Sequence, residues 1–159
     1  MSASKPRVLA IVGPTAVGKS DFALDIAESY KGEIISADSR QVYRYMDIGT
    51  AKPTPEMRRR VAHHLIDLID PDQQYSVAQF VRDATAALHD IWGRQKLPIV
   101  VGGTGLYVKA LLDGLELPEV PPDPALRAEL EQRIRSEGLQ AVVAELLRCD
   151  PDAARIVDL

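Results

Sequence analysis

The sequence of 159 residues contains a single cysteine, Cys149, and therefore cannot form an intrachain disulfide. A solitary thiol is usually a small buried apolar group, and its presence fits a reducing compartment. The sequence also lacks any run of about 18 consecutive apolar residues, and its N-terminus lacks the apolar stretch of a signal peptide. We therefore expect a cytoplasmic protein without a membrane partner.

An excess of positive charge is also missing, because the formal net charge at pH 7 is −4. The chain has no bulk attraction to nucleic acid, so any such binding must use local basic groups or residues outside this chain. Apolar residues make up 46% and charged residues 26% of the sequence, as in an ordinary globular protein. The length allows one core and is too short for two full domains.

What the chain does contain is the pattern G-x-x-x-x-G-K-[ST] over residues 13–20, between a strand-like run at 7–12 and a helical pattern from Ser20. Glycines let backbone N–H groups approach phosphate oxygens, and the helix N-terminus favours negative charge. Lys19 adds positive charge, and the Ser20 hydroxyl is placed to hold Mg²⁺. The predicted diphosphate- or triphosphate-binding residues are Gly13, Thr15, Ala16, Val17, Gly18, Lys19 and Ser20.

Strand and helix patterns alternate through the first part of the chain. We expect Gly32 to close the first helix, and Ser76 to cap a later helix that ends at Gly93. Further strands are predicted at residues 33–37, 65–69 and 97–101, and the last of them leads through a glycine-rich turn into a helix ending at Leu112. The alternation predicts an α/β fold: a P-loop NTPase-like, three-layer core with a parallel sheet.

The composition changes at the proline-rich stretch 117–122, and only helical patterns follow it. Asp123 and Pro124 are typical of a helix start, a second amphipathic helix runs from Leu139, and a third begins at Asp150. We therefore divide the chain into an incomplete core domain, residues 1–116, and the start of an all-helical domain, residues 117–159.

Ligands of open α/β sheets bind beyond the carboxyl ends of the strands. Asp38 follows the strand at 33–37, where a carboxylate serves either as a Mg²⁺ ligand or as a general base. Gly102-Gly103-Thr104 follows another strand, and it either meets a phosphate or forms a tight turn with Thr104 as the helix N-cap. The sequence leaves both pairs of alternatives open.

Five segments occur in the order and spacing of tRNA dimethylallyltransferases: residues 13–20, 35–43, 46–53, 63–67 and 102–107. The chain resembles the N-terminal part of such an enzyme. These enzymes transfer an isoprenyl group from dimethylallyl diphosphate to N6 of the adenosine 3′ of the anticodon. The resemblance implies that the phosphate loop holds the donor diphosphate rather than ATP. It also implies Mg²⁺ as cofactor, the tRNA anticodon stem-loop as partner, and an inserted position for the helical domain.

The resemblance also implies a division of roles within the site. The exocyclic adenine amine is a poor nucleophile, so the transfer needs a base at the amine and charge stabilisation at the departing diphosphate. By resemblance Asp38 takes the N6 proton, while Lys19 and Thr104 act with the loop amides and Mg²⁺ on the diphosphate. The residues implied in tRNA binding are Asp38, Ser39, Arg40, Gln41, Thr104 and Arg127.

For both arginines of this set, a role that does not involve RNA is also available. For Arg40 the alternative is a solvated surface arginine. Arg127, Glu131 and Arg135 follow one another at four-residue spacing, a pattern that a solvent-facing helix explains without any contact to RNA.

His63 and His64 are adjacent, so in an extended segment they point in opposite directions, which favours a structural role over a zinc site.

Three alternative functions remain beside the tRNA enzyme: a small-molecule or nucleotide kinase that uses the same loop on ATP, a non-catalytic nucleotide-binding module, and an adenylate isopentenyltransferase acting on the free nucleotide. The helix that stops at Leu159, the few strands and the negative charge lead us to expect an incomplete chain. Alone it should be inactive and of low stability, while the full-length form should be a monomer.

Overall fold

The computed structural model describes residues 7–115 and 123–155. The chain divides into two compact units, Met1–Pro118 and Glu119–Leu159. The proline-rich connection predicted at residues 117–122 lies outside the described residues. Within the described ranges, no helix combines the length and apolar composition needed to cross a bilayer.

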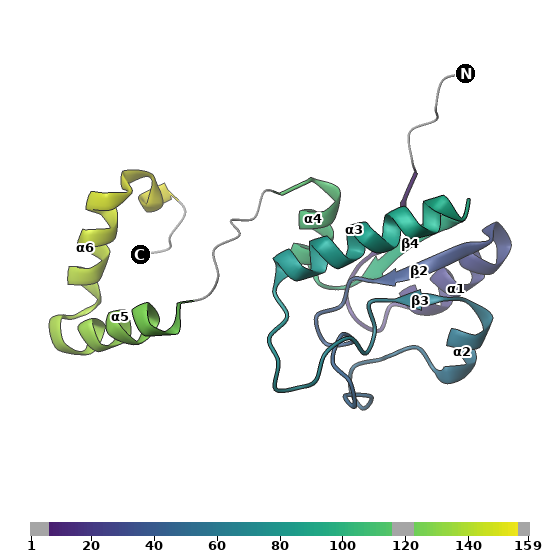
Figure 1. Cartoon of the computed structure of the whole chain (residues 1–159), viewed down its shortest axis with the longest axis horizontal. Helices are drawn as coiled ribbons and strands as arrows, with labels where there is room; N and C mark the ends of the chain where they lie inside the picture. Colours follow the sequence, from purple (N-terminus) through teal and green to yellow (C-terminus); the bar gives the residue numbers. More distant parts are fainter. Residues whose placement is uncertain (1–6, 116–122, 156–159) are drawn as a thin grey trace, which may run out of the picture. The chain divides into compact units, whose positions relative to one another are not determined.

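The first unit contains a four-stranded sheet in the order β1-β4-β2-β3, with every neighbouring pair parallel (Figure 1). The α/β class and the parallel sheet predicted from the sequence are therefore confirmed. The elements of this unit are β1 Leu9–Val12, α1 Lys19–Tyr30, β2 Gly32–Ser36, α2 Pro55–Arg60, β3 His63–His64, α3 Val77–Gly93, β4 Leu97–Gly102 and α4 Gly105–Leu112.

Helices cover both faces of this sheet because successive strand residues point to opposite sides. Ile34 and Ile99 are paired in register and pack in one buried cluster with α1, through side chains that include Leu24. Ile35 and Val100 are paired one residue later and pack in a second cluster. That second cluster is completed from α3 and α4 by Phe80, Ala84, Leu88, Ile91 and Tyr107. The sheet and the helices that pack on its two faces through these clusters form three layers.

Two local predictions in this unit were wrong. The residue that closes α1 in the left-handed conformation is Lys31, with φ of 53°, whereas Gly32 is the first residue of β2. The strand expected at residues 65–69 is not formed, and the chain pairs with β2 at His63–His64 instead. Leu65 and Asp67 have φ of 64° and 57°, and a left-handed backbone cannot continue a β ladder.

The second unit contains α5 Pro124–Glu137, α6 Leu139–Cys149 and the 3-10 helix η1 Pro151–Arg155. The predicted start of α5 is confirmed, because Asp123 Oδ1 accepts from the Leu126 N–H at 3.0 Å. Cys149 is exposed at the end of α6, so the expectation of a buried thiol was wrong. The two helices contain no buried residue, which explains why their last position is open to solvent.

Ion pairs in this unit centre on Arg133, which reaches Glu137 at 3.3 Å and Glu145 at 2.5 Å. Arg127 is exposed on α5. Among residues 123–155 the structure shows no ion pair along the spacing of Arg127, Glu131 and Arg135. Their four-residue ladder therefore does not account for the stability of this helix.

A buried carboxylate holds the sheet of the first unit to its neighbours. The Glu33 side chain on β2 is 2% exposed and accepts hydrogen bonds from Arg94 and Lys96, which follow α3, and from His64 on β3. Burial alone would raise the pKa of Glu33, but these hydrogen bonds outweigh it and lower the pKa to about 2. The cluster therefore stabilises the folded state when the carboxyl is ionised.

Replacing Glu33 by glutamine should therefore destabilise the protein in a pH-dependent way. A folded-state pKa of about 2, against an ordinary value of 4.5, gives a contribution present above about pH 4.5 and lost as pH falls toward 2. At about 1.4 kcal/mol per pKa unit, the shift corresponds to about 3 kcal/mol at pH 7. Urea unfolding followed by Trp92 fluorescence should show this loss at pH 7 and a shrinking difference from the unaltered protein toward pH 3.

The matched control is Glu28→Gln, which removes an exposed pair with Arg60 and should have a much smaller effect. Equal losses in the two variants, or a Glu33→Gln effect that does not change with pH, would contradict this account of the cluster.

Candidate functional site

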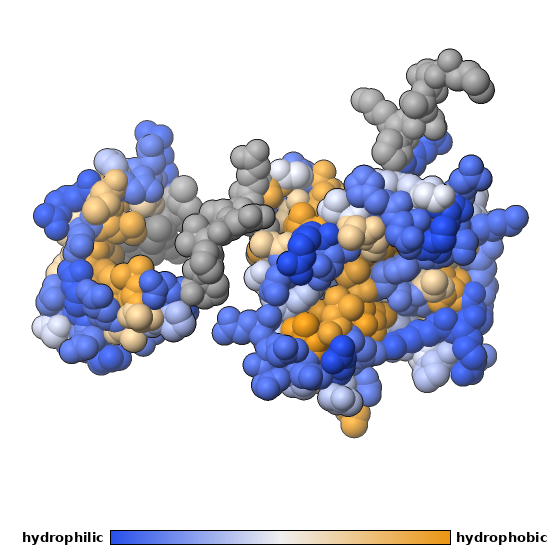
Figure 2. All heavy atoms as spheres, in the orientation of Figure 1, coloured by the Kyte–Doolittle hydropathy of each residue, from blue (hydrophilic) through white to orange (hydrophobic). Residues whose placement is uncertain are grey.

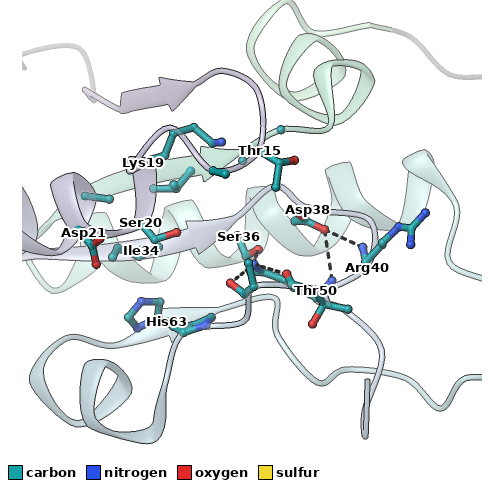
Figure 3. A pocket seen from close by; sticks show the side chains of 18 of the residues that line it. Thr15, Lys19, Ser20, Asp21, Ile34, Ser36, Asp38, Arg40, Thr50 and His63 are labelled. Carbon is teal, nitrogen blue, oxygen red and sulfur yellow. Dashed lines mark hydrogen bonds between the residues drawn. The ribbon is translucent and has the colours of Figure 1, made fainter. Parts of the chain in front are cut away.

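A cleft of about 630 Å³ lies at the carboxyl ends of β2 and β4 and the start of α1. Figure 3 shows Thr15, Lys19 and Ser20 on one wall, and Ser36, Thr50 and His63 on the wall opposite them. Segments far apart in the sequence thus surround one space. The lining residues are Thr15, Ala16, Gly18, Lys19, Ser20, Asp21, Ala23, Ile34, Ser36, Asp38, Arg40, Gln41, Gly49, Thr50, Ala51, Pro53, His63, Val101, Gly102 and Gly103.

The phosphate loop ends in a helix start that has no side-chain cap. Gly18 is the N-cap of α1 with φ of 81°, a conformation that side chains rarely adopt, and no side chain accepts from the first turn. The N–H groups of this turn are therefore available to an anion at the positive end of the helix dipole. Lys19 Nζ lies over the loop and donates to the Pro14 carbonyl at 2.5 Å.

The seven predicted loop residues divide into three groups. Five of them line the cleft: Thr15, Ala16, Gly18, Lys19 and Ser20. Gly13 instead borders a second cavity of about 420 Å³, between the ends of β1 and β4 and α4. Val17 is 59% exposed and lines neither of these two cavities.

Asp38 lies two residues beyond the end of β2 and is partly buried in the cleft. Its Oδ1 accepts from the backbone N–H groups of Arg40 at 2.8 Å and Gln41 at 3.4 Å (Figure 3). These bonds fix the turn that follows the strand and orient the carboxyl group. Arg40 and Gln41 line the same cleft. The structure thus brings Asp38, Arg40 and Gln41 together with Lys19 and Ser20 around one space.

Thr104 joins the ends of β4 and β2. It is the N-cap residue of α4, but its side chain makes no cap hydrogen bond. Its Oγ1 accepts instead from the Ser39 backbone N–H at 3.0 Å, and its own N–H donates to the Ala37 carbonyl. The two strand ends approach so closely that a Cβ at Gly102 would lie 2.1 Å from the Ala37 carbonyl oxygen. Thr104 and Ser39 are therefore held at the same edge of the sheet as Asp38.

Gln41 connects the turn after β2 to a second wall of the cleft. Its Oε1 accepts from Ser36 Oγ at 2.8 Å, and its Nε2 donates to the carbonyls of Thr50 at 3.2 Å and Ala51 at 2.9 Å. Thr50, Ala51 and Pro53 then line the cleft, a role the sequence analysis did not assign to them. The available signal was their place in the segment 46–53 that carries part of the family resemblance.

His63 on β3 also lines the cleft and was missed as a site residue. Its Nδ1 lies 2.8 Å from the Val61 carbonyl oxygen; since a carbonyl only accepts, Nδ1 carries the proton. Burial lowers the pKa of His63 and outweighs the hydrogen bond to the Val61 carbonyl, which raises it, and the nearby Arg58 lowers it further. His64 contacts Glu33 instead, which matches the opposite directions expected of these neighbours.

The wall formed by residues 43–53 is held by one buried ammonium group. The Lys52 side chain is 4% exposed, and its Nζ donates to the Tyr43 carbonyl, Asp47 and Asp67 at 2.6, 2.9 and 2.7 Å. Burial would lower the pKa of Lys52, but the hydrogen bonds to the two carboxylates outweigh it and raise the pKa. The lysine is therefore charged and fixes both ends of the wall.

Replacing Lys52 by methionine should loosen this wall without unfolding the unit. The substitution keeps the apolar stem but removes the charged hydrogen bonds that join Tyr43 and Asp47 to Asp67, while Asp67 keeps its pair with Arg58. We expect amide hydrogen exchange of residues 43–51 to accelerate about 10-fold or more, with exchange in α3 unchanged. Arg82→Gln, which removes an exposed pair with Asp83, is the control; a similar pattern in that variant would refute the role of Lys52.

Comparison with known protein families identifies the family to which the chain belongs. The family described as IPP transferase matches residues 41–159, and the one described as isopentenyl transferase matches residues 6–67. The chain belongs to the IPP transferase family. The prediction made from the five segments is thereby confirmed.

Among curated proteins, the tRNA dimethylallyltransferase of Herpetosiphon aurantiacus is 54% identical over 158 residues, covering 99% of this chain and 50% of that protein. The tRNA dimethylallyltransferase of Thermomicrobium roseum is 55% identical over 154 residues, covering 97% and 46%. The chain thus spans about half the length of the curated relatives it matches.

Solved structures agree with the family and the fold. The full-length tRNA isopentenylpyrophosphate transferase of Bacillus halodurans is similar with a TM-score of 0.70 and 47% identity, covering 97% of this chain and 51% of that one. A eukaryotic dimethylallyltransferase, described as acting on tRNA, gives a TM-score of 0.79 and 32% identity, covering 95% and 37%. The P-loop NTPase-like core expected from the sequence is the fold of these neighbours.

Proposed function

We propose that the full-length protein containing this chain transfers a dimethylallyl group from dimethylallyl diphosphate to N6 of the adenosine 3′ of the anticodon in tRNA. One observation carries this proposal: a phosphate loop with Lys19 and a carboxylate with Asp38 face the same cleft. Anion binding and proton removal are the two requirements of the transfer. The names of the family and of its relatives support the choice of donor and acceptor.

On the donor side, the N–H groups at the start of α1 and the Lys19 ammonium would hold the diphosphate. The charge on the bridging oxygen grows as the allylic C–O bond breaks. These donors are fixed by the loop before reaction, so they stabilise that charge without reorganising. Thr104 Oγ1 lies at the Ser39 end of the site and would act there as a hydroxyl donor.

On the acceptor side, Asp38 would act as the general base. The N6 nitrogen forms a bond to the allylic carbon, the C–O bond to the diphosphate breaks, and one N6 proton passes to the Asp38 carboxylate. Hydrogen bonds from the Arg40 and Gln41 amides hold that carboxyl group in place. Ser39, Arg40 and Gln41 would contact the adenosine, and Arg127 of the second unit would contact the tRNA elsewhere.

The residues of the cleft fit Mg²⁺ of the kind bound jointly with a substrate. Mg²⁺ commonly takes one or two protein oxygens and completes its shell with substrate phosphates and water. The Ser20 hydroxyl lines the cleft at the start of α1, where it would hold the ion. Among the described residues, no group of three His, Cys, Asp or Glu side chains forms a separate metal site. The bound ion would offset diphosphate charge.

Ligand binding separates this proposal from the kinase and the binding-module alternatives. A ligand that binds only the folded state raises its stability, by about 2.7 kcal/mol at a concentration of 100 times Kd. Thermal unfolding of the full-length protein with Mg²⁺ should shift with the thio-analogue of dimethylallyl diphosphate and much less with ATP. A shift with ATP alone would favour the kinase.

The acceptor is tested by mass spectrometry of nucleosides after incubation with the donor. An anticodon stem-loop and free adenosine monophosphate are offered separately to the full-length protein. Prenylated adenosine from the stem-loop supports the proposal. Product from the free nucleotide alone would instead identify an adenylate isopentenyltransferase.

A further inference from the structure

The segment between β2 and α2 exposes large apolar side chains next to the cleft. Ile48 is 99% exposed, Tyr45 is 81% exposed and Met46 is 37% exposed. Figure 2 shows hydrophobic atoms projecting from the lower edge of the first unit, where Figure 1 draws this segment. Single exposed apolar residues are common on protein surfaces, but here three fall within four consecutive positions and form a cluster along the chain.

This segment is firmly anchored rather than loose. Thr50 Oγ1 donates to the Met46 carbonyl at 2.6 Å, and the Arg44 N–H donates to the Ile69 carbonyl at 2.8 Å. Lys52 adds its bonds to Tyr43 and Asp47. The apolar side chains are therefore presented to solvent by a fixed backbone, so the backbone of this segment loses little conformational freedom when a partner binds.

The residues next to this apolar cluster indicate which kind of partner it binds. Gly49 and Thr50, which follow Ile48 directly, line the cleft that the proposed function assigns to the target adenosine. Enzymes that act on a base take it out of the stack, which leaves the adjoining bases with unpaired faces. Unstacked bases of single-stranded RNA are bound by aromatic and apolar side chains beside cationic ones. Arg40, exposed in the same cleft, supplies such a cation.

We propose that Tyr45 and Ile48 contact the unpaired nucleobases that flank the target adenosine in the acceptor RNA. This inference rests on the proposed function and extends it, because it assigns acceptor contacts to two side chains that do not line the cleft. Tyr45 supplies a flat surface on which a base stacks. Ile48 fills space next to the base that has been taken out of the stack.

The test measures RNA affinity in the full-length protein by fluorescence of an anticodon stem-loop that carries 2-aminopurine next to the target adenosine. Tyr45→Ala should weaken binding about 10-fold and Ile48→Ser about 5-fold, as expected for the loss of one stacked or packed base. Tyr45→Phe keeps the ring and should bind like the unaltered protein. Affinity for the donor thio-analogue and the Tm without RNA should not change in any of these variants.

Tyr30→Ala is the matched control, because Tyr30 is 66% exposed on α1 and does not line the cleft. Unchanged RNA affinity in Tyr45→Ala and Ile48→Ser, with prenylation intact, overturns this inference and leaves the proposed function standing. A lower Tm of these variants without RNA also overturns it, since the side chains would then be covered by the protein itself. Failure of the unaltered protein to prenylate the stem-loop removes the proposed function, and the inference falls with it.

Discussion

Asp38→Asn in the full-length protein is expected to lower kcat by a factor of about 100 to 10,000, the range typical of losing a general base. The amide oxygen can still accept from the Arg40 and Gln41 N–H groups, so the turn after β2 should keep its shape. An amide cannot take the N6 proton, so the defect belongs in kcat rather than in donor affinity. Single-turnover prenylation of a stem-loop, with the Kd of the donor thio-analogue measured separately, checks this.

Asp21→Asn provides the control for Asp38, because Asp21 is a second carboxylate in the same cleft, on α1. Its replacement should change kcat only a few-fold. The competing role for Asp38 is that of a Mg²⁺ ligand, which would lower Mg²⁺-dependent donor binding and allow turnover to recover at higher metal concentration. That result would exclude the general base.

The elements that position the site were predictable because each has a strong local signal. The phosphate loop combines a fixed motif with a strand before it and a helix after it, and α1 begins at Lys19, one residue from the expected position. Ser76 and Gln79 form a reciprocal capping box at the start of α3. The segments after β2 and β4 were expected to lie at the ligand-binding ends of their strands, and the hydrogen bond between Ser39 and Thr104 shows that the two segments meet there.

The missed features depend on contacts between distant residues. The apolar composition of residues 65–69 favours a strand. Asp67 instead forms ion pairs with Lys52 and Arg58, and its backbone has a left-handed conformation that ends the pairing. Glu33 lies within an apolar strand pattern, and its partners Arg94 and Lys96 are some sixty positions away. The left-handed cap at Lys31 was missed because glycine usually takes that position.

Lys19→Ala is expected to weaken binding of the dimethylallyl diphosphate thio-analogue severely. The loop amides would remain, but the diphosphate would lose its one charged partner from the loop in a partly desolvated site. Removing a charged partner of this kind costs about 2–5 kcal/mol, which is a loss of affinity between about 30-fold and several thousandfold. Isothermal titration of the full-length variant with Mg²⁺ present measures the loss directly.

The control for Lys19 is Lys109→Ala, which removes the same charge from α4 beside the second cavity. If attraction to the diphosphate came only from the net charge of the unit, both substitutions would weaken binding alike. If Lys19 contacts the diphosphate directly, only Lys19→Ala should lose donor affinity. That loss should persist at high salt, because a desolvated pair is screened less than exposed charges. Donor affinity retained in Lys19→Ala would instead place the diphosphate away from the loop and remove the basis for assigning this cleft to the donor.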